Sequence, residues 1–386
     1  MTTNDDMVSG HRGQDRASTR PEMRFRGETD DEGEGVTAAP IGFAILGTGI
    51  IAETHRQAIA MNANLGARLV AVGHYDPSRF AAIGERFGVP CLSEAELLKR
   101  PDVDVVCVAT PSGQHAEQAI AAAEAGKHVL VEKPLALGLA DADAMITACD
   151  TAGVRLGVLL QQRAEPLFRR VYQAIRAGDL GDIAMASVCM PYHRPQAYYD
   201  QSAWRGTWEQ DGGGVLMNQG IHFVDLLLWL MGADPVSITA RAATLQRQIE
   251  AEDTVVATLE FGNGALATLS ATTTAPPGFR QRVEVYGTAG AIQLEGDAAV
   301  RWETARGTGQ DSGQSTNPAA PAAATPTPAF PTAGSQSPVP HAALIRDFVE
   351  ALRDGRPPAV DGREGRRSVA AVLGIYEAAG LLPRRG

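Results

Sequence analysis

Residues 41–52 read IGFAILGTGIIA, an apolar run followed by two glycines and then by the start of a helical pattern. A strand, a tight turn and a helix in this order are typical of a dinucleotide-binding loop. Gly47 permits the turn, Gly49 lets the backbone approach a pyrophosphate, and the small Ala52 lets the helix pack closely on the strand. We therefore predict that a dinucleotide contacts Gly47, Thr48, Gly49, Ile50 and Ile51.

The alternation of strand and helix continues to about residue 160. Apolar runs lie at 68–72, 103–109, 128–131 and 155–160, and helical patterns separate them. Uninterrupted apolar strands that alternate with helices predict a parallel sheet covered on both faces. The expected fold class is α/β, with a doubly wound Rossmann sheet that binds NAD(P) over residues 39–163.

Beyond residue 164 the pattern changes to strand pairs around glycine-containing turns. One pair lies at 254–261 and 265–273, and another at 282–286 and 291–294. Such pairs are typical of antiparallel hairpins. Further helical patterns lie at 167–177, 221–230, 342–352 and 368–381. We predict a second α/β domain over residues 164–383, built on a mainly antiparallel sheet.

Two segments lack the apolar residues that a folded core requires. Residues 1–38 are polar and charged, and they are predicted to be a disordered tail. Residues 305–338 are rich in Ala, Pro, Thr, Gly and Ser, and they are predicted to be a long solvated loop.

The composition restricts the classes of partner. The 386 residues carry a net charge of −11, which opposes binding to nucleic acid or to an anionic membrane surface. The chain has no apolar run of about 20 residues, the length that a membrane-spanning helix needs. Its four scattered cysteines favour reduced thiols over disulfides or a metal site. We expect a cytoplasmic protein without a metal.

Asp76 follows the second predicted strand, where an acidic residue can bind both ribose hydroxyls of an adenosine. A carboxylate there also disfavours a 2′-phosphate, so we predict NAD as the cofactor. The nearby Arg79 leaves NADP as an alternative.

Glu132, Lys133 and Pro134 follow the strand at 128–131. The carboxyl ends of parallel strands face the ligand crevice of such a sheet. A lysine in this place can bind a substrate hydroxyl or the nicotinamide ribose, and it can stabilise developing alkoxide charge. A surface turn is the alternative interpretation of this tripeptide.

A third motif, GGGVLMNQGIHFVD, occupies residues 212–225. His222 lies one helical turn after Asn218, so the two share a face if the segment is helical. An imidazole with a pKa near ~6.5 suits the proton exchange that accompanies oxidation of an alcohol. Asn218 can orient a hydroxyl or the imidazole. Asp225 could orient His222 or could instead be a structural ion-pair partner.

In this order the motifs resemble the glucose–fructose oxidoreductase / inositol dehydrogenase family (Gfo/Idh/MocA). The segments TPSGQH at 110–115, AGKHV at 125–129 and WRGTW at 204–208 also match that family. The resemblance implies a second domain with an open antiparallel sheet, tightly held NAD(H) or NADP(H), and a homodimer or homotetramer formed through that sheet. It further implies that the cofactor contacts Thr110, Pro111, His115, Glu132 and Lys133.

The resemblance also assigns catalytic roles. It makes Lys133 the catalytic lysine and His222 the acid/base, and the frequent Asp of the family one turn earlier is Asn218 here. His222 is therefore expected to be the main proton acceptor, with Lys133 as the second candidate. Substrate contacts are expected between the two domains, where polar and aromatic residues suit sugar hydroxyls and rings: Arg163, Tyr192, Arg194, Trp204, Arg205 and His222.

The predicted function is hydride transfer between NAD(P) and a secondary alcohol or carbonyl of a sugar, polyol or sugar derivative. Two alternatives stay open. The enzyme could recycle its bound cofactor during a hydrolysis of the glycosidase type or an epimerisation. The fold could also serve a dinucleotide-binding regulator that has no catalytic activity.

Overall fold

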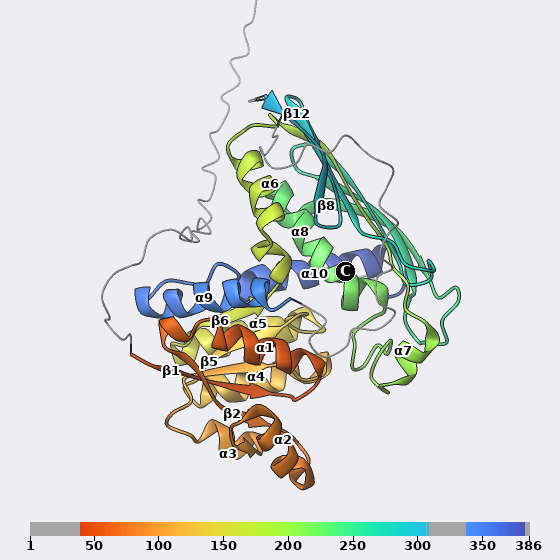
Figure 1. Ribbon diagram of the computed structural model, residues 1–386. Helices are drawn as coiled ribbons and strands as arrows, with labels where there is room; N and C mark the ends of the chain where they lie inside the picture. The colour runs from red at the N-terminus through yellow and green to blue at the C-terminus, as the bar shows by residue number, and fades with distance from the viewer. Residues whose placement is uncertain (1–38, 306, 309–336, 383–386) are drawn as a thin grey trace, which may run out of the picture.

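The computed structural model describes residues 39–305, 307–308 and 337–382 (Figure 1). The predicted tail at 1–38 and nearly all of the predicted loop at 305–338 lie outside the described residues. Neither prediction is therefore tested.

Six described strands form a parallel sheet in the order β3-β2-β1-β4-β5-β6. This is the Rossmann order, so the predicted fold of the first domain is confirmed. The chain reverses its direction of travel between β1 and β4, and ligands bind at such a switch point. The strands are β1 (Ile41–Leu46), β2 (Ala67–Gly73), β3 (Cys91–Leu92), β4 (Val105–Val108), β5 (His128–Glu132) and β6 (Leu156–Leu159).

The helices between these strands pack through small and apolar side chains. In α1, Ala52 is fully buried, as close packing against the first strand requires. Each helix begins soon after a strand ends, so the helix N-termini gather at the carboxyl edge of the sheet. The helices are α1 (Ile50–Ala60), α2 (Phe80–Phe87), α3 (Glu94–Leu98), α4 (His115–Glu124) and α5 (Leu139–Ala152).

The second sheet has eight strands within the described part of the chain, in the order β14-β13-β12-β11-β7-β10-β9-β8. Both predicted hairpins are present, as β9 with β10 and β11 with β12. β7 joins them and runs parallel to β10, so the sheet is mixed but mainly antiparallel. Its strands are β7 (Ile183–Pro191), β8 (Pro235–Ala243), β9 (Thr254–Phe261), β10 (Leu266–Thr272), β11 (Arg282–Gly287), β12 (Gly290–Glu295), β13 (Ala298–Thr304) and β14 (Gly307–Thr308).

Helices cover one face of this sheet, and α9 reaches the Rossmann domain. Figure 1 shows α6 and α8 beside the sheet and α9 lying across the parallel sheet. α9 packs on α1, whereas α10 packs on α5, α8 and β8. The two C-terminal helices thus contact helices of the first domain as well as elements of the second. The predicted division of the chain at residue 163 remains a prediction. The helices are α6 (Pro166–Arg176), α7 (Gln196–Asp200), α8 (Ile221–Met231), α9 (Val339–Asp354) and α10 (Gly362–Ala378).

Candidate active site

A cavity of about 1050 Å³ lies at the carboxyl edge of the parallel sheet and extends to the second domain. Most of the predicted site residues line it, although they come from distant parts of the chain. They are Gly47, Thr48, Gly49, Ile50, Ile51, Thr110, Pro111, His115, Glu132, Lys133, Tyr192, Arg194, Trp204, Arg205, Asn218 and His222. Asp76 and Arg163 are not among the lining residues.

The glycine-rich loop has the shape that a dinucleotide needs. Gly47 has a φ of +93°, and a Cβ on it would lie 2.5 Å from the carbonyl oxygen of Ala109, so glycine is required there. At Gly49, by contrast, an added Cβ would meet no atom within 4 Å. The backbone of Gly49 is therefore open to close approach by a phosphate, at the N-terminus of α1.

His115 lies between the loops after β4 and β5. Its Nδ1 lies 2.8 Å from the carbonyl oxygen of Pro134, and its Nε2 lies 3.1 Å from that of Thr110. Burial lowers the pKa of His115, so the ring is neutral near pH 7 and its single N–H donates to one of these two oxygens. His115 thus lines the cavity beside both loops, and its predicted contact with the cofactor remains a prediction.

Asp76 follows β2 directly after Tyr75, which lines the cavity, and its predicted contact with the ribose remains a prediction. Its exposed carboxylate accepts hydrogen bonds from the amide and hydroxyl of Ser78, at 2.9 and 2.6 Å, and so caps the turn that begins at Pro77. The cavity wall at the end of β2 is formed by His74, Tyr75 and Arg79. Both hydrogen bonds from Ser78 end on Oδ1, so Oδ2 of Asp76 has no hydrogen-bond partner among the described residues.

Lys133 and His222 come from different domains and face the same cavity. Lys133 Nζ donates a hydrogen bond of 2.8 Å to the carbonyl oxygen of Asn218. Asn218 lies in a π-helical turn, Leu216–Gly220, that leads into α8, and such turns are frequent at functional sites. Burial lowers the pKa of Lys133. Burial, together with the charge of Lys133, lowers the pKa of His222 to about 3, so its imidazole is neutral at pH 7.

Asp211 is a site residue that the sequence interpretation missed. The side-chain amide of Asn218 donates to both oxygens of the Asp211 carboxylate, at 2.8 and 3.0 Å, rather than to His222. Burial raises the pKa of Asp211 to about 6, against hydrogen bonds from Gly206 and Asn218. The family often has an aspartate at the position of Asn218. In this chain the nearby carboxylate is that of Asp211, which is hydrogen-bonded to the Asn218 side chain. The sequence signal that could have identified Asp211 is its position directly before the three glycines at 212–214.

Glu252 and Tyr376 hold the three glycines at 212–214 in place through hydrogen bonds. Glu252 accepts hydrogen bonds from the amides of Gly214 and Leu216, at 2.9 and 2.8 Å, and from the hydroxyl of Tyr376 at 2.9 Å. A Cβ on Gly214 would lie 1.7 Å from the carbonyl oxygen of Glu252. Glycine is needed here because two backbone segments touch, and this contact fixes the start of the turn that carries Asn218.

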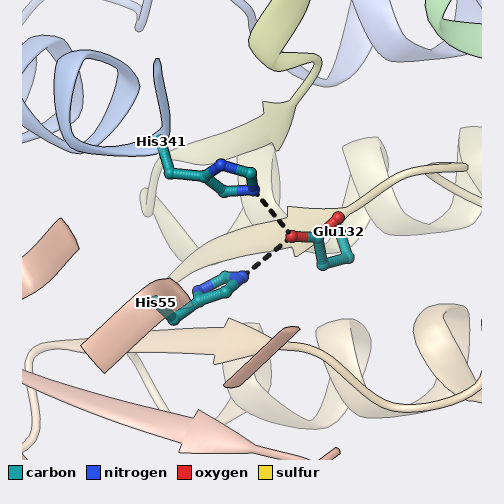
Figure 2. A group of neighbouring side chains, drawn as sticks. All are labelled: His55, Glu132 and His341. Carbon is teal, nitrogen blue, oxygen red and sulfur yellow. Dashed lines mark hydrogen bonds and ion pairs between the residues drawn. The ribbon is translucent and has the colours of Figure 1, made fainter. Parts of the chain in front are cut away.

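Glu132 lies in a buried cluster with His55 of α1 and His341 of α9 (Figure 2). Both Nε2 atoms face the same carboxylate oxygen, at 2.9 and 3.3 Å. The other oxygen accepts from the amide of Lys133 at 3.2 Å. Although burial opposes ionisation, the hydrogen bonds from His341 and His55 hold the pKa of Glu132 well below its usual value. Glu132 therefore carries a negative charge directly behind Lys133.

The same three side chains have their ligand atoms within 4.8 Å of one another, a spacing at which a metal ion could be held. The buried Nδ1 atoms of His55 and His341 have no hydrogen-bond partner in the described part of the chain. A metal-bound imidazole needs an acceptor for its second N–H. The cluster is better suited to two Nε2–H donors that share one carboxylate.

The structure corrects the expectation for Arg163. This side chain is buried, and it donates to both oxygens of Asp225 at 2.8 and 2.6 Å and to Glu364 at 2.8 Å. Ser368 also donates to Asp225, at 2.7 Å. Arg163 therefore does not contact a substrate, and Asp225 does not orient His222. A guanidinium with so few exposed atoms needs carboxylate partners, and these two meet that need.

Known proteins with similar sequences match both domains. The model of the "Oxidoreductase family, NAD-binding Rossmann fold" matches residues 41–160, and that of the "GFO/IDH/MocA C-terminal domain" matches residues 168–293. Inositol 2-dehydrogenase of Rhizobium meliloti (strain 1021) is 32% identical over 273 residues, which cover 69% of this chain and 79% of the relative. The chain belongs to the Gfo/Idh/MocA family of oxidoreductases.

Two solved dehydrogenase structures are similar to this chain in fold. The WlbA dehydrogenase from Bordetella pertussis, solved with NADH and UDP-GlcNAcA, is 34% identical with a TM-score of 0.76, over 90% of this chain and 100% of that one. Levoglucosan dehydrogenase, solved with NADH and levoglucosan, is 25% identical with a TM-score of 0.73, over 89% of this chain and 98% of that one. The predicted family membership is therefore confirmed, and the protein is by family an NAD(P)-dependent oxidoreductase of sugars and polyols. None of the helices in the described ranges is long and apolar enough to cross a membrane.

Proposed function

We propose that this protein transfers a hydride between NAD(P) and a secondary alcohol or carbonyl carbon of a sugar or sugar derivative. The observation that carries the proposal is the placement of Lys133 and His222, from two domains, on the cavity that begins at the glycine loop. That loop would hold the pyrophosphate, since Gly49 leaves open space beside the α1 N-terminus. The bound nicotinamide would supply the hydride acceptor or donor.

The protein's own residues manage the proton. In the oxidation direction, neutral His222 accepts a hydrogen bond from the substrate hydroxyl and then its proton. Lys133, backed by the negative charge of Glu132, stabilises the oxygen as negative charge develops on it. Asp211 accepts a hydrogen bond from the side chain of Asn218 and so positions that residue. The backbone carbonyl of Asn218 accepts a hydrogen bond from the Lys133 ammonium. These roles rest on geometry and on the family resemblance.

The activity is tested by incubating the protein with NAD+ or NADP+ and a panel of polyols, sugars and sugar derivatives, while reduced nicotinamide is followed by absorbance. A substrate-dependent increase supports the proposal. Substrate conversion without a net absorbance change would instead favour an enzyme that recycles its cofactor. Cofactor binding without any turnover over the panel would favour the regulator.

The pH dependence of oxidation should report Asp211 rather than His222. His222, with a pKa of about 3, stays neutral from pH 8 down to 5, so its base form is not lost in that range. Asp211 has a pKa of about 6, and its protonation below that pH removes the charge that holds Asn218. We expect kcat/KM to fall below pH 6 in the native protein, and the fall to disappear in Asp211→Asn. If kcat/KM of the Asp211→Asn variant still fell as the pH dropped through about 6.5, this assignment would be contradicted.

We also infer that the cofactor site accepts the 2′-phosphate of NADP. The β2 end presents His74, Tyr75 and Arg79 to the cavity, while the Asp76 carboxylate is held by Ser78. Arg79 lies close to His74, with Nη1 3.4 Å from Nε2, and an arginine in this region suits a phosphate. Arg79 therefore supports NADP as the alternative, whereas Asp76, whose Oδ2 is unpaired among the described residues, still supports NAD.

The change Arg79→Ala should weaken NADP+ binding by roughly tenfold or more, because it removes a charge-assisted hydrogen bond. The Kd for NAD+ in the same variant serves as the control and should change little. The substitution His74→Asp should act in the opposite sense and improve discrimination in favour of NAD+. Equal losses of both cofactors in Arg79→Ala would show that Arg79 does not read the phosphate.

We further propose self-association through the uncovered face of the second sheet, as a homodimer or homotetramer. Its strands alternate buried and exposed side chains, and the exposed ones include Met185, Val256 and Leu266. Such an apolar face favours association in water. Light scattering would give the mass in solution, and a monomer at micromolar concentration would contradict the proposal.

A further inference from the structure

Two arginines share one tyrosine ring on the cavity wall. The guanidinium carbon of Arg205 lies 4.4 Å from the ring centre of Tyr198, and that of Arg194 lies 5.6 Å from it. Both arginines line the cavity, and the Tyr198 ring is only 6% exposed. The arginines are thus held against a buried aromatic surface rather than free in solvent.

Neither guanidinium forms an ion pair with a described carboxylate, although the buried Asp211 is near enough to Arg205 for their charges to interact. In the described ranges, no carboxylate lies within ion-pair distance of Arg194 or Arg205, whereas Arg280, Arg301 and Arg367 of the second domain each have one. Arg194 donates one hydrogen bond to the carbonyl oxygen of His193, and Arg205 donates one to that of Tyr198. The buried Nε atom of each has no partner among the described residues.

Such an arrangement carries two local costs. Two like charges beside one ring repel each other, and buried N–H groups without an acceptor lose free energy. An anion bound to both guanidiniums would offset their repulsion, because a carboxylate or phosphate accepts paired N–H bonds from arginine. The cavity therefore has the chemistry of an anion-binding subsite.

The arginines lie a short distance from the catalytic residues. The side chain of Gln219 donates to the Tyr198 hydroxyl at 3.3 Å and to Asn218 Oδ1 at 3.2 Å. The carbonyl of Asn218 accepts the bond from Lys133. One sugar could therefore place its reacting carbon at Lys133 and an acidic substituent at the arginines.

We propose that Arg194 and Arg205 bind the acidic group of the substrate, so that this enzyme acts on an anionic sugar and not on a neutral polyol. The inference rests on the proposed function, since it concerns the same cavity. The acid could be a sugar carboxylate or the phosphate of a nucleotide sugar. Both bind guanidinium by the same bidentate hydrogen bonds.

The test measures binding to the full chain loaded with NADH, by calorimetry. The probes are glucuronate, UDP-glucose, UDP-glucuronate and neutral glucose. We expect at least one anionic probe to bind more tightly than glucose. Glucuronate above glucose would identify the carboxylate, whereas UDP-glucose above glucose would identify the phosphates.

The variants Arg194→Gln and Arg205→Gln should each weaken the preferred anion by roughly 10- to 100-fold, the effect of losing a hydrogen bond to a charged group. Arg363→Gln removes the same charge from an exposed position on α10 and is the matched control. Arg194→Lys keeps the charge without the fork of N–H groups, and it should recover only part of the affinity.

Absence of binding of both NADH and NADPH would contradict the proposed function itself, and a protein that binds only NADPH is tested in its NADPH-loaded form. With NADH bound, equal affinity for glucose and the three anions, or no response to either Arg→Gln change, would overturn the present inference alone. If Arg205→Gln does not fold, the Arg194 variants and the comparison of probes with the native protein still decide it.

Discussion

Replacing Lys133 with methionine should lower kcat for sugar oxidation by about 10²-fold or more. The ammonium lies on the cavity wall, hydrogen-bonded to Asn218 and backed by the charge of Glu132. Methionine fills a similar volume, so the cavity keeps its shape while the charge is lost. Initial rates at saturating substrate, measured by nicotinamide absorbance, give kcat directly.

The matched control is Lys99→Met, which removes the same group from an exposed position at the end of α3. It should leave kcat unchanged. The Kd for the cofactor should vary much less than kcat in Lys133→Met, because the glycine loop is untouched. A Lys133→Met enzyme with native kcat would refute the catalytic role of the lysine.

Replacing Asp225 with asparagine should cost about 3 kcal/mol of unfolding free energy. The substitution leaves Arg163 buried with one of its two carboxylate partners, and it also weakens the bond from Ser368. Urea unfolding followed by circular dichroism would measure the loss in the transition that includes α8. Catalysis by the remaining folded protein should be nearly native, since neither residue lines the cavity.

Asp234→Asn provides the comparison for this prediction. Asp234 pairs with Arg367 at the surface, with a side chain that is 60% exposed, so its loss should cost no more than about 1 kcal/mol. The double change Arg163→Met with Asp225→Leu removes both charges, and it should recover much of the stability. Equal effects of the two single changes would mean that burial of the pair is unimportant.

The part of the site that depends on local sequence was predictable. The strand, turn and helix at 41–52 are close in sequence, and the structure places Gly47 and Gly49 as their chemistry requires. The cap at Asp76 is also local, because the order Asp-Pro-Ser is a recognisable helix start. This cap uses one carboxylate oxygen, and the predicted contact of Asp76 with ribose is not tested.

The contacts between distant residues could not be predicted in this way. Arg163 and Asp225 each suggested a functional role separately, and their pairing across 62 positions removes both roles. The strand β7 lies between β10 and β11, a position set by pairing with residues about 80 to 100 positions away. A single sequence carries no direct signal for such pairings, whereas it does carry one for turns and caps.

The contact between α9 and α1 has a consequence for biosynthesis. Glu132 needs hydrogen bonds from His55 and from His341, and these two residues are separated by most of the chain. During synthesis the parallel sheet emerges first, but the support behind Lys133 stays incomplete until α9 has left the ribosome. We therefore expect a chain that ends before α9 to form the glycine loop but to lack the His341 contact that supports the charge of Glu132 beside Lys133.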